Sequence, residues 1–333
     1  MFLWLLSKRR LGPMDIPLLI ASFAGTFLLC AALLPFYIRK ALKVKMTGTD
    51  IHKKDRPEIA ESGGIILVVV YVMGLFSLLP SYIIGGDGVV FSIISTGATV
   101  LLCAFSGLID DVFDLPWRIK VLTPLIGGIP IAVMLLGHSV IWTPFGYVNF
   151  GILFYILVIP VIVTSCSNAV NMLAGLNGVE AGSVLITSLG LLMASVLEGK
   201  EVGIVLLVPF IGSLLAFLLY NKYPSKVFPG DVGTFSMGAV IASCAILSNL
   251  ERATFVMFIP HILNAALFFL GKLQKRAPIR DAPLNPDGTL PVNSIWSLRN
   301  LILRIKPMTE KQAVVTVWII VAVFAVLGGF IYP

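Results

Sequence analysis

Residues 107–120 read Gly-Leu-Ile-Asp-Asp-Val-Phe-Asp-Leu-Pro-Trp-Arg-Ile-Lys and join two apolar runs, at 89–108 and 121–137. If the first run continues as a helix through Asp114, the spacing places Asp110, Asp111 and Asp114 on one face of that helix. Acids at the end of a membrane span are costly and indicate function. The alternative is a solvated polar turn between two spans, which three acids on one face fit poorly.

The composition indicates a membrane protein, because 58% of the 333 residues are hydrophobic and 12% are charged, against about 25% charged in soluble domains. Helical spans need about 17 to 25 apolar residues. Ten runs qualify, near 14–38, 62–80, 89–109, 121–137, 150–168, 181–197, 202–220, 233–249, 252–271 and 312–332. The sequence therefore predicts an all-α integral membrane protein of about ten transmembrane helices, with residues 1–333 as a single polytopic domain.

The basic residues predict the orientation of these spans. The connections after the odd-numbered runs carry 19 of the 24 Lys and Arg residues, and such loops face the cytoplasm. Both termini are then expected outside, although Lys8, Arg9 and Arg10 argue against this. Because topology accounts for the basic charge, we expect no nucleic-acid partner.

A second polar stretch follows the fifth run, where Asn168, Asn171 and Asn177 occur close together with Gly175. Asn168 and Asn171 are three apart and can share a helix face. Glycine at 175 fits a tight loop that re-enters the bilayer, and Asn offers neutral oxygen ligands. The alternative is polar contacts between helices, which such a dense run makes the weaker interpretation.

Other polar residues lie in the connections on the same predicted face. Asp231 begins the eighth run, either as a helix cap or beside an anion site. Glu61 precedes two glycines at the start of the second run, and His52 is interpreted as a loop histidine rather than a metal ligand. Arg276 and Arg280 lie in the last connection, and arginine pairs well with phosphate oxygens.

Together these residues predict a phosphate chemistry at the membrane surface. Carboxylate and amide oxygens without His or Cys indicate a hard cation, and Mg²⁺ is the usual one at phosphate sites. The basic residues indicate an anionic substrate. The hypothesis from the residues alone is Mg²⁺-assisted phosphoryl transfer, with Mn²⁺ as an alternative ion.

Three motifs then carry a family resemblance: residues 110–120, residues 168–180, and residues 223–231, which read Tyr-Pro-Ser-Lys-Val-Phe-Pro-Gly-Asp. They resemble the polyprenyl-phosphate N-acetylhexosamine-1-phosphate transferases. The second and third are most similar to the archaeal and eukaryotic branch, the UDP-N-acetylglucosamine–dolichyl-phosphate N-acetylglucosamine-phosphotransferases. The bacterial branch usually has an acidic version of the second motif. The resemblance covers residues 40 to 290.

The resemblance implies a ten-helix fold in which a polyprenyl or dolichyl phosphate attacks UDP-GlcNAc and releases UMP, as the first step of lipid-linked oligosaccharide assembly for protein glycosylation. It also implies site residues by position. They are Asn171 and Asp231 for Mg²⁺; Asp110, Asp111, Asp114 and Lys120 for catalysis and phosphate contact; Gly175, Asn177 and Phe228 for the uracil; Glu61 for the ribose; Arg276 and Arg280 for the sugar phosphate; and Asn168 for substrate binding.

One departure concerns the last connection, which lacks the His that the family usually carries there, so the sugar contacts are left open. Asp114 and the compact last connection favour an archaeal cell membrane over an endoplasmic reticulum membrane, with the active site facing the cytoplasm. A homodimer is left open. The alternatives for function are a bacterial-type transferase with another UDP-sugar, and a multi-span transporter or flippase.

Overall fold

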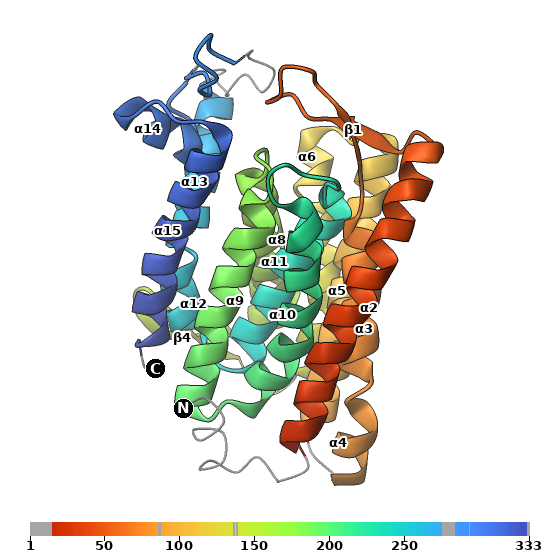
Figure 1. Cartoon of the computed structure of the whole chain (residues 1–333). Coiled ribbons are helices and arrows are strands. Elements are labelled where there is room, and N and C mark those ends of the chain that lie inside the picture. The colour runs from red at the N-terminus through yellow and green to blue at the C-terminus, as the bar shows by residue number, and fades with distance from the viewer. Residues whose placement is uncertain are drawn as a thin grey trace.

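The structure is a computed structural model that describes residues 15–85, 88–135, 137, 139–274, 284–292 and 294–331. These residues are mostly helical (Figure 1). The helices are α2 (Asp15–Lys43), α3 (Gly64–Phe76), α4 (Leu79–Gly85), α5 (Val89–Phe113), α6 (Trp117–Lys120), η1 (Thr123–Gly128), α7 (Ile129–Met134), η2 (Phe154–Val158), α8 (Ile159–Leu173), α9 (Val179–Glu198), α10 (Glu201–Asn221), α11 (Gly230–Leu247), α12 (Glu251–Met257), α13 (Ile259–Leu273), α14 (Leu298–Ile305) and α15 (Glu310–Gly329). Two antiparallel hairpins pair β1 (Thr47–Thr49) with β2 (Glu58–Ala60), and β3 (Val140–Thr143) with β4 (Gly146–Asn149).

Nine apolar helical segments of the described chain are long enough to cross a bilayer, and α12 and α13 form a tenth, bent by 62°. These segments coincide with the ten apolar runs, so the predicted all-α integral membrane fold is confirmed. Pro260 lies at the start of α13, where proline is tolerated but cannot continue a preceding helix. The fourth span runs from Trp117 to Met134, so Lys120 belongs to the span rather than to the connection before it.

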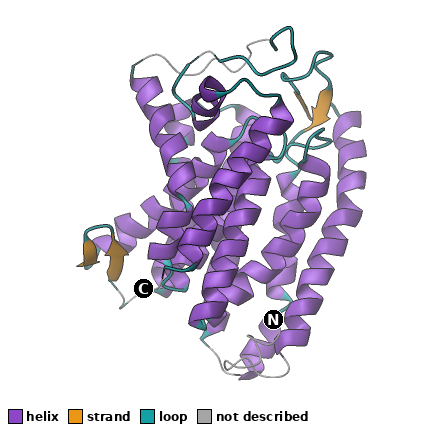
Figure 2. Ribbon diagram, turned by 60° about the vertical axis from the view of Figure 1, so that its left-hand side comes forward, coloured by secondary structure: helices purple, strands orange, loops and turns teal. Residues whose placement is uncertain are grey.

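The connections gather at two opposite ends of the bundle (Figures 1 and 2). Hairpin β1–β2, α6 and α14 lie at one end, and hairpin β3–β4 and α4 lie at the other. The start of α2 and the end of α15 are both at the β3–β4 end. Because the number of spans is even, the first span begins and the last span ends at the same end of the bundle. The connections after the odd-numbered spans then all lie at the opposite end.

Helix α11 is buried along nearly its whole length and packs against α5, α8 and α3. Glycines allow these close contacts: a Cβ on Gly107 of α5 would lie 2.4 Å from the carbonyl carbon of Asp231, and one on Gly64 of α3 would lie 2.3 Å from the Cα of Gly233. A Cβ on Gly238 of α11 would likewise lie 2.5 Å from the carbonyl carbon of Cys166 in α8. Small residues let membrane helices pack backbone to backbone, so the position of α11 is tightly fixed.

Two connections at the β1–β2 end are joined by backbone hydrogen bonds. The Phe228 N–H donates to the Ala60 carbonyl at 2.8 Å, and the Gly63 N–H donates to the Phe228 carbonyl at 2.9 Å. This pairing places Glu61 and Phe228 side by side at the mouth of the bundle.

Candidate active site

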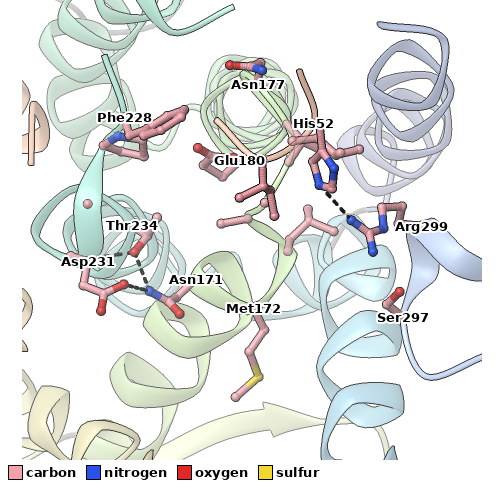
Figure 3. A pocket seen from close by; sticks show the side chains of 18 of the residues that line it. His52, Asn171, Met172, Asn177, Glu180, Phe228, Asp231, Thr234, Ser297 and Arg299 are labelled. Atoms are coloured by element: carbon pink, nitrogen blue, oxygen red, sulfur yellow. Dashed lines mark hydrogen bonds between the residues drawn. The ribbon is translucent and has the colours of Figure 1, made fainter. Parts of the chain in front are cut away.

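A cavity of about 360 Å³ opens at the β1–β2 end of the bundle, between the connections and the ends of the spans (Figure 3). Seven of the residues predicted for the site line it. They are Glu61, Lys120, Asn171, Gly175, Asn177, Phe228 and Asp231. They come from the three motifs and the first connection, so the fold brings together segments that are far apart in the sequence.

The charged centre of the cavity is formed by Lys120 between two carboxylates. Its ammonium lies 2.6 Å from Asp110 Oδ2 and also pairs with Asp231 Oδ2. The amide nitrogen of Asn171 donates to the other oxygen of Asp231 and, at 2.9 Å, to Thr234. Figure 3 shows Asp231, Asn171 and Thr234 on one side of the cavity. This cluster sets one cation between two acids, which suits the binding of a phosphate and its counterion.

Asp111 has a different position from its neighbour Asp110. Its Oδ1 accepts from the Asp231 N–H at 2.7 Å, and its Oδ2 accepts from the Ser62 hydroxyl at 2.8 Å and the Val232 N–H at 3.3 Å. The first N–H groups of a helix have no partner within the helix. Asp111 therefore caps α11 from the end of α5, and Asp231 is not itself the cap.

Asp114 and Asn168 are predicted site residues that do not line the cavity. Helix α5 ends at Phe113, and Asp114 follows in a left-handed conformation (φ 47°) with an exposed side chain, so the expectation that all three acids share one helix face is wrong for Asp114. Asn168 is buried and donates to the carbonyls of Val121 and Thr164, each at 2.9 Å. The bond to Val121 links α8 to the residue that follows α6. Asn168 thus makes a polar contact between helices, which is the alternative that the sequence favoured less. Arg276 and Arg280 lie outside the described residues.

The connection after α8 forms one wall of the cavity. Gly175 has φ +127°, which favours glycine, and a Cβ there would meet no atom within 4 Å. Asn177 is 3% exposed and contacts the buried carboxylate of Glu310 at the start of α15. No pattern in the sequence pointed to Glu310, because it lies 133 residues from Asn177 at the start of an apolar span without other acids.

Glu61 lies at the mouth of the cavity, where its backbone carbonyl accepts a hydrogen bond of 2.6 Å from the Tyr37 hydroxyl. Burial raises the pKa of the Glu61 carboxyl, and the nearby negative charge of Asp111 raises it further. The carboxyl can therefore hold a proton at a higher pH than an exposed glutamate.

His52 lies in the connection between β1 and β2, as expected of a loop histidine, but it is only 5% exposed and lines the cavity. Its Nε2 lies 3.3 Å from the Arg299 guanidinium, as Figure 3 shows. Because a guanidinium can only donate, Nε2 must accept, and the imidazole is neutral. Burial, together with the positive charge of Arg299, lowers the pKa of His52 to about 4, and the opposing effect of Asp50 is smaller.

This low pKa predicts an acid-sensitive contribution to stability. Between pH 6.5 and about 4 the unfolded chain protonates His52 while the folded chain does not, so the free energy of unfolding falls as the pH falls through that window. We expect His52→Gln to reduce the drop in thermal midpoint between pH 7.5 and pH 5. An equal drop in variant and wild type would contradict this.

The oxygens of the central cluster fit a hard divalent ion in part. Asp231 and Asn171 offer a carboxylate and an amide, which Mg²⁺ accepts alongside phosphate oxygens. The ammonium of Lys120 lies where the carboxylates of Asp110 and Asp231 converge, so a cation suits that point. Across the described residues, no three His, Cys, Asp or Glu side chains surround a common point. An ion here would therefore need substrate oxygens to complete its shell.

Comparisons with known proteins show which chains this one is similar to. Residues 93–249 match Glycosyl transferase family 4. A Saccharolobus solfataricus protein with the provisional name UDP-N-acetylglucosamine–dolichyl-phosphate N-acetylglucosaminephosphotransferase is 35% identical, over 87% of this chain and 89% of its own. A Sulfolobus acidocaldarius protein with the same provisional name is 36% identical, over 85% and 86%. The Dictyostelium discoideum UDP-N-acetylglucosamine–dolichyl-phosphate N-acetylglucosaminephosphotransferase is 27% identical, over 86% and 82%.

Proposed function

The chain belongs to glycosyl transferase family 4, and we propose that it transfers N-acetylglucosamine 1-phosphate from UDP-GlcNAc to a polyprenyl or dolichyl phosphate. The names of its archaeal and eukaryotic relatives support this donor and this acceptor. The observation that carries the proposal is the cavity in which the three motifs meet, with Lys120, Asp231 and Asn177 all on its wall.

In the proposed reaction, an oxygen of the lipid phosphate attacks the β-phosphorus of UDP-GlcNAc. A new P–O bond forms there, the bond between the β-phosphorus and the bridging oxygen breaks, and UMP leaves carrying that oxygen on its α-phosphorus. A phosphate monoester is largely ionised at neutral pH, so the main tasks of the protein are to position the two phosphates and to balance their charge.

The residues of the cavity divide these tasks by position. Lys120 would contact phosphate oxygens, since its ammonium is the cation at the centre of the cluster. Asp110 would orient the lipid phosphate or accept its proton. Asp111 would act with it, although both of its oxygens already accept hydrogen bonds. Mg²⁺, or Mn²⁺ in its place, would be held by Asp231 and Asn171, and would neutralise charge on the diphosphate.

The nucleotide would occupy the wall formed by Gly175, Asn177 and Phe228, with Glu61 near the ribose. The lipid would arrive from the side of α5 and α6. There Phe113 is 71% exposed and stands next to the acidic end of α5. A polyprenyl chain can lie along such apolar side chains while its phosphate reaches the cluster.

The chain is a multi-pass membrane protein, and we propose that the cavity faces the cytoplasm of an archaeal cell. The positive charge of the connections at that end supports this orientation. It would place the cavity where cytoplasmic nucleotide sugars are available.

Purified protein in detergent should release UMP from UDP-GlcNAc only when both a polyprenyl phosphate and Mg²⁺ are present. The lipid is required because it is the attacking group, and the ion because it balances the diphosphate charge. UDP-GalNAc and UDP-MurNAc-pentapeptide in parallel reactions test the choice of sugar. Absence of UMP with every donor, in protein shown to be folded, would reject the transferase proposal and favour a transporter.

A further inference from the structure

Four separate segments meet at the side chain of Asn177. Glu310 Oε1, at the first turn of α15, accepts from the Asn177 backbone N–H at 2.8 Å and from its amide nitrogen at 2.5 Å. The amide nitrogen also donates to Asp50 Oδ2 at 3.0 Å, in the connection between β1 and β2. The Ser225 N–H, in the connection before α11, donates to the amide oxygen at 3.2 Å.

A single lysine holds the two acids of this network together. The Lys53 ammonium pairs with Glu310 Oε2 and lies 3.2 Å from Asp50 Oδ2. It also lies 4.2 Å from the centre of the Tyr223 ring, in the same connection as Ser225. Asp50 and Glu310 are 4% exposed. Two buried carboxylates this close would repel each other, so Lys53 is what allows both to face one amide.

These contacts permit only one orientation of the Asn177 amide. A flipped amide would set its oxygen against the carboxylates of Asp50 and Glu310, and its nitrogen against the N–H of Ser225. Each of those contacts would be repulsive, because carboxylates only accept and an N–H only donates. The nitrogen is therefore fully used, whereas the oxygen has a second lone pair.

The amide oxygen is on the side of Asn177 nearer Phe228, and the amide nitrogen is on the side nearer His52 (Figure 3). Asn177 lines the cavity. A flat ring lying on Phe228 would thus meet an acceptor from Asn177 and not a donor.

We propose that Asp50, Lys53 and Glu310 are positioning residues that fix Asn177 as an acceptor and so make the site select uracil over cytosine. The proposal rests on the proposed uridine-nucleotide donor. Uracil offers an N3–H donor at its hydrogen-bonding edge, whereas cytosine has an unprotonated N3 that can only accept. With cytosine the Asn177 oxygen would face another acceptor, and a buried polar mismatch of this kind discriminates strongly.

The direct test compares the binding of UDP and CDP to the full-length protein by calorimetry. Wild type should prefer UDP by at least about tenfold, the discrimination that an unpaired buried group gives. Glu310→Gln and Asp50→Asn each remove a charge that opposes the flipped amide. In each variant the logarithm of the ratio of the CDP to the UDP dissociation constant should therefore fall to about half of its wild-type value or lower. A purely structural defect would weaken both ligands equally and leave that ratio unchanged.

The matched control is Glu58→Gln, which removes an exposed carboxylate from the same hairpin. It should keep the wild-type ratio. A second probe needs no variant: UDP methylated at N3 lacks the donor and should bind wild type at least about tenfold more weakly than UDP.

The outcomes separate the two proposals. Equal binding of UDP and CDP, or of UDP and its N3-methyl form, by protein that releases UMP would overturn the selection of uracil and leave the transferase proposal standing. An unchanged ratio in folded Glu310→Gln and Asp50→Asn would overturn the positioning role. Protein that neither binds UDP nor releases UMP would reject both.

Discussion

Asp231→Ala should lower the kcat for UMP release by at least about a thousandfold, in the range that a lost electrostatic contact at a reacting phosphate produces. The carboxylate of Asp231 pairs with Lys120 on one oxygen and with Asn171 on the other. Its loss would leave Lys120 with Asp110 alone and would remove the charged ligand proposed for Mg²⁺. The measurement is the rate of UMP release at saturating UDP-GlcNAc and lipid phosphate.

The same variant should keep its fold. The contact that starts α11 is made by the backbone N–H of residue 231 to Asp111, and an alanine retains it. The thermal midpoint should therefore stay close to that of wild type. Asp55→Ala, which removes an exposed acid from the β1–β2 connection, is the matched control and should retain activity. Wild-type turnover by Asp231→Ala would remove this residue from the active site.

Gly107→Ala should destabilise the protein by about 1–3 kcal/mol or more, the usual cost of an overpacked contact. The added Cβ would lie 2.4 Å from both the carbonyl carbon and the oxygen of Asp231, and these backbone atoms cannot turn aside. Helices α5 and α11 would have to separate, and Asp110 would move away from Asp231. We expect a lower thermal midpoint in detergent together with reduced UMP release.

Gly25→Ala provides the comparison within the same class of substitution. Gly25 lies in α2, and a Cβ there would meet no atom within 4 Å. Alanine is also the better helix former, so this variant should be as stable as wild type or slightly more so. Equal midpoints for the two variants would show that the α5–α11 contact tolerates separation.

The sequence predicted the spans well, because a helix that crosses a bilayer must be apolar over a fixed length. It also identified the acids and amides at their ends as site candidates. It could not separate Asp110 from Asp114, since that difference depends on where α5 ends and on a single left-handed residue. Nor could it separate Asn168 from Asn171, which differ only in the face of α8 that they occupy.

The contacts of Asn177 show a different kind of limit. Its role was suggested by a motif, but the partners that orient it lie in three other segments. Asp50 and Glu310 are ordinary surface residues by their local sequence: one belongs to a charged connection and the other to the first turn of a helix, where acids are common. Only the packing of the spans makes them neighbours.

The cap that Asp111 provides has a thermodynamic consequence. Helix ends ordinarily fray because their first amides lack partners, and a carboxylate carried there would sample many positions. Here the amides of Asp231 and Val232 are pinned to the adjacent helix. The entropic cost of positioning the Asp231 carboxylate is thus met when the chain folds. It does not reduce the free energy of binding of each substrate molecule.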